Sequence, residues 1–154
     1  MEIRIDRLSI QDASIAFEWV LRLLQELGDE GDDLGTLNEK KVLNEWKQAG
    51  DRFQVFAAKT SEGKIIGVMT LMETFAVYAN GNYGIINEMY TDPESRSSGV
   101  GAALIDAAKQ YGRARGWERI DVTAPESPGW ERSRQFYEKN GFHFTGPKLK
   151  FVLK

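Results

Sequence analysis

The stretch that decides the fold is Asp92-Pro93-Glu94-Ser95-Arg96-Ser97-Ser98-Gly99-Val100-Gly101-Ala102-Ala103-Leu104. An apolar segment typical of a strand, 84–91, precedes it, and a segment with helical periodicity, 99–115, follows it. The first turn of a helix has backbone N–H groups without internal partners, and the helix dipole adds partial positive charge there. With two glycines and the guanidinium of Arg96, this order predicts an anion site, and we expect the anion to be a pyrophosphate.

Composition indicates one soluble domain and excludes several kinds of site. The chain has 154 residues, 42% hydrophobic and 28% charged, which suffices for a single domain over residues 1–154. The net charge of −3 argues against a general nucleic-acid binder, and the lack of cysteine excludes thiolate metal sites and a cysteine nucleophile. The single histidine, His143, argues against a histidine metal centre or a Ser-His-Asp triad. No run approaches the ~18–20 apolar residues of a membrane span, and no secretory signal is evident, so we expect a cytoplasmic location.

Hydrophobic periodicity predicts the element order β α α β β β α β α β β. Strands are expected at 2–8, 52–60, 65–77, 84–91, 118–124, 142–145 and 148–153. Helices are expected from a cap at Ser9 or Asp12 to residue 27, from Thr36 or Asn38 to residue 49, and at 99–115 and 130–140. Successive short connections predict antiparallel strands, whereas the strand-helix-strand crossover from 84 to 124 predicts a parallel pair. We therefore expect an α+β fold, a central mixed and mostly antiparallel sheet with about four helices on its two faces.

Three blocks of sequence resemble the GCN5-related N-acetyltransferase (GNAT) family, in its order and spacing. Asn87-Glu88-Met89-Tyr90-Thr91-Asp92-Pro93-Glu94 is similar to the family's fourth strand and its exit. Arg96-Ser97-Ser98-Gly99-Val100-Gly101 matches the family's Arg/Gln-x-x-Gly-x-Gly/Ala signature. Phe136-Tyr137-Glu138-Lys139-Asn140-Gly141-Phe142 is similar to its C-terminal tyrosine helix. The chain departs from the family at Ser97-Ser98, where Gly-Lys is usual, and at Trp130, where many members have Asn.

The resemblance implies acetyl-CoA as co-substrate and no metal. The strand before the loop would carry a β-bulge and splay from the next strand, and its freed N–H groups would bind the thioester oxygen in the gap. A dinucleotide loop would need a glycine where Leu104 stands, and a Walker loop would need Gly-Lys-Ser/Thr. The cofactor-binding residues implied are Met89, Tyr90, Thr91, Arg96, Ser97, Ser98, Gly99, Val100, Gly101, Ala102, Ser133 and Tyr137.

The chemistry needs a base and an acid, because an alkyl ammonium with a pKa near ~10.4 must lose a proton before it attacks a thioester. Glu88 interrupts an apolar run and can equally be the solvent side of an alternating strand; the resemblance makes it the candidate base, with Glu73 in reserve. Tyr137 lies on the apolar face of the last helix, where a core aromatic is the plain interpretation. The resemblance makes its hydroxyl the acid that meets the departing thiolate.

The motifs leave the acceptor open. The loop Asp29-Glu30-Gly31-Asp32-Asp33 is either a solvated acidic loop or one that steers a polyamine, an aminoglycoside or a lysine amine. Tyr78 and Tyr83 offer rings for cation–π contacts with such a molecule. We expect an N-acetyltransferase acting on a primary amine of a small molecule or peptide by direct attack, with neither nucleic acid nor membrane as partner; a homodimer, common in the family, stays open. The alternatives are a non-catalytic acyl-CoA-binding module and an interaction domain.

Overall fold

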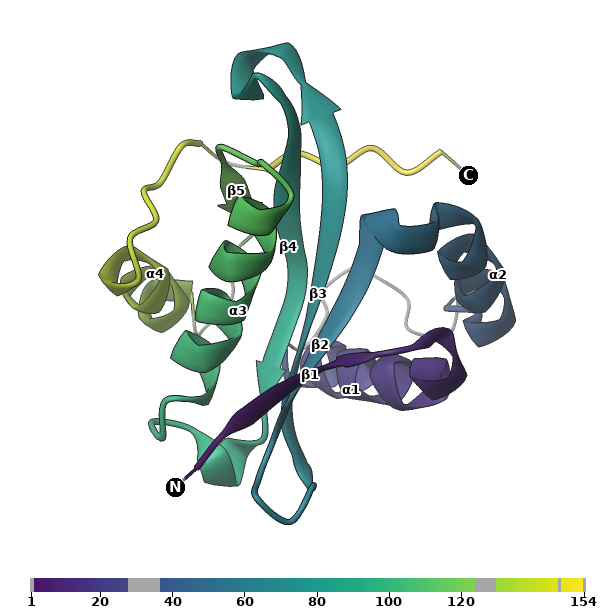
Figure 1. Cartoon of the computed structure of the whole chain (residues 1–154), viewed down its shortest axis with the longest axis vertical. Coiled ribbons are helices and arrows are strands. Elements are labelled where there is room, and N and C mark those ends of the chain that lie inside the picture. The colour runs from purple at the N-terminus through teal and green to yellow at the C-terminus, as the bar shows by residue number, and fades with distance from the viewer. Residues whose placement is uncertain (1, 28–36, 124–129, 147, 154) are drawn as a thin grey trace.

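The computed structural model describes residues 2–27, 37–123, 130–146 and 148–153. Within them, five strands form one sheet in the order β1-β2-β3-β4-β5 (Figure 1). The first four strands pair antiparallel, and β5 runs parallel to β4. The strands are β1 Arg4–Leu8, β2 Phe53–Lys59, β3 Ile65–Ala76, β4 Gly81–Thr91 and β5 Ile120–Val122; the α-helices are α1 Ala13–Glu26, α2 Glu39–Ala49, α3 Val100–Ala114 and α4 Trp130–Lys139.

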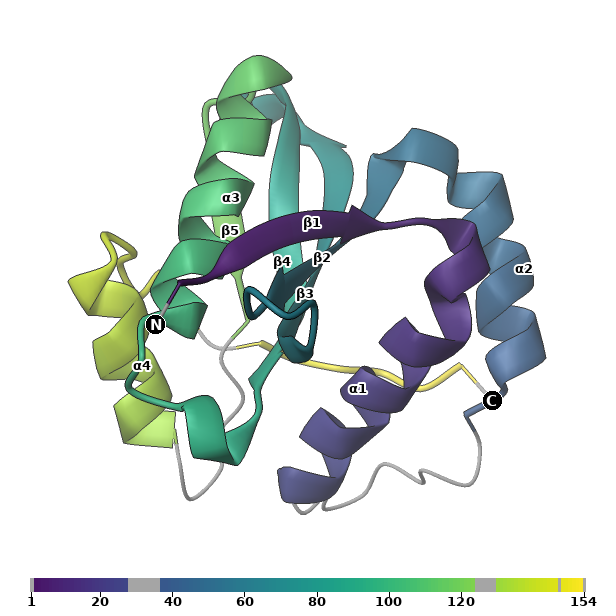
Figure 2. The same ribbon diagram turned by 60° about the horizontal axis from the view of Figure 1, so that its bottom comes forward.

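Helices cover both faces of the sheet, with α1 and α2 on one side and α3 and α4 on the other (Figure 2). Each face has its own core: Met69 and Leu104 belong to the cluster that includes α3, and Val68 and Trp19 belong to the cluster that includes α1. Neighbouring residues of β3 thus point into different cores, which explains why this strand reads as a continuous apolar run. The expected mixed sheet with helices on both faces is confirmed. No helix in the described parts of the chain is long and apolar enough to cross a membrane.

Polar capping and turn residues mark the ends of several of these elements. Ser9 and Asp12 form a capping box before α1, and the Asn38 side chain accepts a hydrogen bond of 3.0 Å from the Lys41 N–H at the start of α2. The turn between β3 and β4 is closed by Asn80 and Gly81, whose φ angles are 60° and 115°. Both angles lie in the region that favours Asn and Gly, so the Asn-Gly signal marks a real hairpin.

The parallel strand β5 is placed by Trp117, which is buried between α3 and β4. A Cβ atom at Gly84 of β4 or at Gly112 of α3 would collide with the Trp117 ring, so both positions require glycine for this packing. Trp117 lies just before β5, and the Gly84 N–H donates to the Arg119 carbonyl at 3.1 Å. Packing of one side chain therefore fixes where the crossover returns to the sheet.

The two strands expected at 142–145 and 148–153 are absent from the described residues there, which join no ladder. The alternation that indicated the second one, Leu149, Phe151 and Leu153, is exposed by 91%, 85% and 94%. A strand needs an edge to pair with, and the edge on this side is β5, which has 3 residues. That prediction was wrong because an apolar pattern indicates that one side of a segment could be buried. It does not show whether a neighbouring strand is available to pair with the segment.

Candidate functional site

The sheet loses its regular ladder in the middle of β4. Thr70 pairs with Glu88 whereas Leu71 pairs with Ile86, so Asn87 is an extra residue that forms a β-bulge. The parallel ladder to β5 ends at the Ile86–Val122 pair, although β4 continues to Thr91. The resemblance implied a bulge in this strand, and the ladder places it at Asn87.

The bulge decides which way Glu88 faces. Ile86 and Met89 contact the core on the α3 side, whereas Tyr90 belongs to the core on the α1 side. Because one residue is inserted, Glu88 shares the α1 side with Tyr90 instead of the α3 side with Ile86. Glu88 accordingly lines a small hollow against α1, together with Trp19 and Leu23.

Thr70 on β3 holds Glu88 in this position. Its hydroxyl oxygen accepts a hydrogen bond of 3.2 Å from the Glu88 backbone N–H, and its O–H donates to the carboxylate oxygen Oε1 of Glu88. Thr70 is buried, and Glu88 is half-buried. Among the described residues the second carboxylate oxygen of Glu88, Oε2, has no hydrogen-bond partner.

The N-terminus of α3 is open toward the loop that precedes it. The first internal helix bond joins the Ala103 N–H to the Gly99 carbonyl at 3.0 Å, and Gly99 provides no side-chain cap. The N–H groups of Val100, Gly101 and Ala102 therefore have no partner within the described helix, as an anion site requires. A Cβ atom at Gly99 would have no atom of the described residues within 4 Å, so nothing in that part of the chain crowds this position.

Gly101 has a second role that the signature alone did not reveal. A Cβ atom there would lie 2.8 Å from the Phe136 ring of α4. Glycine at this position therefore lets α4 pack closely on α3, while its N–H remains in the open first turn. Val100 is 1% exposed, so its side chain belongs to the core on the α3 side and is not available to a ligand.

Arg96, the cation of the loop, is already bound by Glu26 at the end of α1. Its Nη2 lies 2.8 Å from each Glu26 carboxylate oxygen, and its Nε donates to the Thr91 carbonyl at 3.1 Å. The Tyr90 hydroxyl donates to Glu26 at 3.2 Å, and the Arg96 guanidinium lies 5.2 Å from the centre of the Tyr90 ring. Burial, reinforced by Glu26, raises the pKa of Tyr90 and keeps this hydroxyl neutral. These contacts connect the loop to α1.

A second arginine lies on the same side. The Arg22 guanidinium is 4.1 Å from the centre of the Trp19 ring and 5.5 Å from that of Tyr90, and it pairs with Asp92 at 3.5 Å. Sequence reasoning missed Trp19, Arg22 and Glu26. Their spacing at i, i+3 and i+7 was the signal that could have found them, because it places all three on one helix face.

Tyr137 on α4 contacts two aromatic rings, one on the same helix and one just after it. Its ring centre is 5.2 Å from that of Phe136 and 5.7 Å from that of Phe142. Burial raises the pKa of Tyr137 to about 12, so the hydroxyl keeps its proton at neutral pH. Within the described part of the chain this hydroxyl has no hydrogen-bond partner. Ser133, four residues earlier on α4, is half-buried.

Glu88 and Tyr137 do not touch each other, as judged from the described residues. Glu88 faces α1, whereas Tyr137 contacts the core on the α3 side. Met89, the next residue along β4, contacts the same core as Tyr137. The strand at 88–89 therefore lies between the two groups, at the point where its ladder to β5 has already ended.

Glu73, the reserve base, has a different role. It is buried, and its carboxylate accepts hydrogen bonds from Arg115 Nη2 at 2.6 Å, Arg115 Nε at 2.9 Å and Trp117 Nε1 at 2.5 Å. The hydrogen bond from Arg115 lowers the pKa of Glu73, although burial opposes it. A carboxylate held by three donors and kept ionised is a poor proton acceptor, so these contacts argue against Glu73 as the base.

The tyrosine pair also differs from expectation. Arg119 lies 4.7 Å from the centre of the Tyr78 ring and 6.0 Å from that of Tyr83, so the chain's own arginine occupies these rings. The Tyr78 hydroxyl, 3.1 Å away, raises the pKa of Tyr83 to about 12 by hydrogen bonding. Figure 1 places this hairpin at the opposite end of the sheet from the start of α3.

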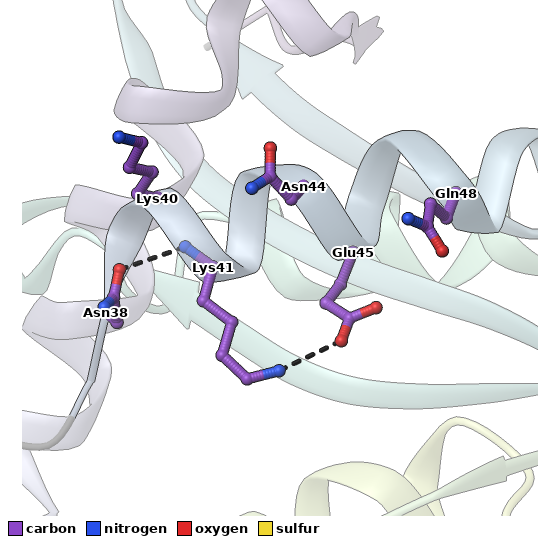
Figure 3. A pocket seen from close by; sticks show the side chains of 6 residues that line it. All are labelled: Asn38, Lys40, Lys41, Asn44, Glu45 and Gln48. Carbon is purple, nitrogen blue, oxygen red and sulfur yellow. Dashed lines mark hydrogen bonds and ion pairs between the residues drawn. The ribbon is translucent and has the colours of Figure 1, made fainter.

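A larger hollow lies on the outside of α2 (Figure 3). Its walls are the side chains of Asn38, Lys40, Lys41, Asn44, Glu45 and Gln48. Lys41 and Glu45 pair across it at 3.0 Å. All these residues come from one helix and its cap, so the hollow cannot enclose a ligand, and it carries no argument for function. The acidic loop 29–33 lies outside the described residues.

Comparison with known proteins finds a matching family and a curated relative. Residues 20–142 match the model of the family described as "Acetyltransferase (GNAT) family". The uncharacterized N-acetyltransferase YhfO of Bacillus subtilis (strain 168) is 29% identical over 80 residues, or 52% of this chain and 52% of that protein. The chain thus matches about half the length of this curated relative.

Two solved structures share the fold over nearly the whole chain. The aminoglycoside acetyltransferase meta-AAC0020 from an uncultured soil metagenomic sample, in complex with sisomicin, has a TM-score of 0.79 and 19% identity, covering 99% of this chain and 97% of that one. A "predicted acetyltransferase with acetyl-CoA" from Clostridium acetobutylicum has a TM-score of 0.79 and 22% identity, with coverage of 99% and 97%. At these identities the likeness concerns the fold alone. The family match spans most of the sequence, and the chain belongs to the acetyltransferase (GNAT) family.

Proposed function

We propose that this protein transfers an acetyl group from acetyl-CoA to a primary amine. The observation that carries the proposal is the bulged strand β4, which leads through an open, uncapped turn into α3. The strand supplies backbone groups outside the β5 ladder, and the turn supplies unpaired N–H groups for a pyrophosphate. Family membership supports the same reading, since the two features lie in the region that its model matches.

Acetyl-CoA would be held by backbone more than by side chains. The N–H groups from Ser97 to Ala102 and the Arg96 guanidinium would bind its pyrophosphate, with the Ser97 and Ser98 hydroxyls in place of the family's lysine. Met89, Tyr90 and Thr91 would offer main-chain groups to the pantetheine arm and the thioester oxygen. Ser133 and Tyr137 would bound the site from α4.

Glu88 and Tyr137 would each carry out one proton transfer in a direct acetyl transfer. Oε2 of Glu88, directly or through a water molecule, takes a proton from the ammonium group. The neutral amine attacks the thioester carbon, the C–N bond forms and the C–S bond breaks. Tyr137 donates its proton to the departing thiolate, the nitrogen loses its second proton to solvent, and solvent reprotonates the Tyr137 hydroxyl. The products are an amide and free coenzyme A, and the amine attacks the thioester directly; a thioester on the enzyme is excluded because the chain has no cysteine.

The acceptor is proposed to be an amine-bearing small molecule or a peptide amine. An aminoglycoside acetyltransferase shares the fold, which makes cationic amines the first class to test. The acidic loop 29–33 would attract such molecules. A homodimer, frequent in the family, would be compatible with one site in each copy.

The test is an amine panel with detection of released thiol. It includes spermidine, sisomicin, free amino acids, lysine peptides and peptide N-termini. We expect thiol release that depends on both the amine and acetyl-CoA. Binding of acetyl-CoA without release for any amine would overturn the enzyme proposal in favour of an acyl-CoA sensor. If acetyl-CoA at 100 times its expected Kd did not raise the melting temperature, the cofactor site itself would be wrong, because bound ligand at that level stabilises by ~2.7 kcal/mol.

A further inference from the structure

The hydroxyl of Thr70 is a buried polar group with two partners, both on one residue across the sheet. Thr70 is 3% exposed, and its partners are the backbone N–H and the carboxylate of Glu88. Thr70 and Glu88 are also the last regular pair of the β3–β4 ladder before the bulge at Asn87. A buried hydroxyl at a break in the ladder therefore contacts the one carboxylate of β4 that lines the hollow against α1.

The chemistry of the two groups fixes the direction of each bond. A backbone N–H only donates, so the Thr70 oxygen accepts there. An ionised carboxylate only accepts, so the single O–H of Thr70 must point to Oε1 of Glu88. The hydroxyl thus uses its proton on the carboxylate, while its oxygen satisfies an N–H of the irregular ladder. Oε2 is left without a partner among the described residues.

We propose that Thr70 is a positioning residue for acyl transfer: it fixes the Glu88 side chain so that Oε2 faces the incoming amine. This inference rests on the proposed function, in which Glu88 is the base. Carboxylates on strands have several rotamers, and a base displaced by an ångström loses much of its effect. A hydrogen bond to one oxygen selects a single orientation and leaves the other oxygen to react.

The test compares Thr70→Val, which keeps the shape and loses the hydroxyl, with Thr70→Ser, which keeps the hydroxyl. With spermidine and sisomicin as acceptors, we expect Thr70→Val to lower kcat about tenfold to a hundredfold, the usual effect of a hydrogen bond to a charged group. The KM for acetyl-CoA should stay within about twofold. Thr70→Ser should restore most of kcat. In a Glu88→Gln background, Thr70→Val should add less than about a twofold further loss.

Crystal structures of the variants provide a readout that needs no acceptor. We expect the Glu88 carboxylate to leave its observed position in Thr70→Val and to keep it in Thr70→Ser. An unmoved carboxylate in Thr70→Val overturns the proposal, as do equal losses of kcat in both variants or a full additional loss in the Glu88→Gln background. Thr70→Ala replaces Thr70→Val if the latter does not fold. Wild-type turnover in Glu88→Gln would instead refute the role of Glu88 as base, which separates the two failures.

Discussion

Tyr137 shows how its surroundings suit a residue to chemistry. It is partly buried against the core on the α3 side, and its hydroxyl has no hydrogen-bond partner among the described residues. Burial also raises its pKa to about 12, so the proton stays in place at neutral pH. We expect Tyr137→Phe to cut turnover about tenfold or more while acetyl-CoA affinity stays unchanged. The same substitution should leave the melting temperature nearly unchanged, since the ring contacts with Phe136 and Phe142 remain.

Thiol-release kinetics, isothermal titration with acetyl-CoA and thermal unfolding measure these three effects. Tyr111→Phe is the matched control, because that hydroxyl belongs to α3 and contacts the Asp51 carbonyl at 3.4 Å. The control should leave turnover intact. Unchanged turnover in Tyr137→Phe would show that the thiolate takes its proton from another source.

Between elements, the pair of Glu26 and Arg96 connects α1 to the loop before α3. Their side chains are 45% and 36% exposed, so the pair contributes at most about 1 kcal/mol to stability. Its larger effect concerns ligands, because a pyrophosphate must compete with Glu26 for the Arg96 guanidinium. We expect Glu26→Gln to tighten coenzyme A binding up to about fivefold, and Arg96→Gln to weaken it. Isothermal titration at low and high salt measures both changes, which should shrink as salt screens the charges.

The control for this pair is Glu18→Gln, which removes the same charge from an exposed position of α1. It should change the affinity little. A Glu26→Gln variant that binds coenzyme A as weakly as Arg96→Gln would mean that the two residues hold the loop as one unit. Competition between carboxylate and pyrophosphate would then be the wrong account.

Features that depend on the backbone preferences of their own residues could be predicted from the sequence. Features that depend on how one strand pairs with another could not. Asn38, one of two cap candidates with Thr36, and the turn at Asn80-Gly81 follow from their own backbone preferences. The side of the sheet that Glu88 faces depends on an extra residue in the ladder, and an alternating pattern cannot reveal it. The prediction of a strand at 148–153 was wrong for the same reason, since a strand pairs only with a free sheet edge of sufficient length. The loop and helix of the candidate site were predictable because both follow from glycine and helix-end chemistry.

In the whole molecule, groups with shifted pKa values set the pH range of stability. The pKa of Glu73 is lowered by its hydrogen bond from Arg115, so its contribution is present above the ordinary value of 4.5 and is lost as pH falls below it. The pKa values of Tyr83 and Tyr137 are raised to about 12, so their contribution is present below pH 10 and is lost as pH rises from 10 toward 12. Stability should therefore have a plateau between these two limits.

Protonation of Glu73 in acid should weaken contacts between several elements, because its carboxylate joins β3 to Arg115 after α3 and to Trp117 before β5. We expect Glu73→Gln to lower the free energy of unfolding by about 1–3 kcal/mol at pH 7, since the buried Trp117 N–H and the Arg115 guanidinium lose their ionised acceptor. Urea unfolding between pH 3 and pH 7 should then show a smaller loss of stability with acid in the variant than in the wild type. If both lose stability equally over this range, other carboxylates such as Asp6, whose pKa is lowered chiefly by its hydrogen bond from Lys59, govern the acid limit. A smaller loss in the variant would instead show that the hydrogen bond between Glu73 and Trp117 governs the acid limit of stability. This buried bond holds Trp117, and therefore the crossover to β5, against the sheet.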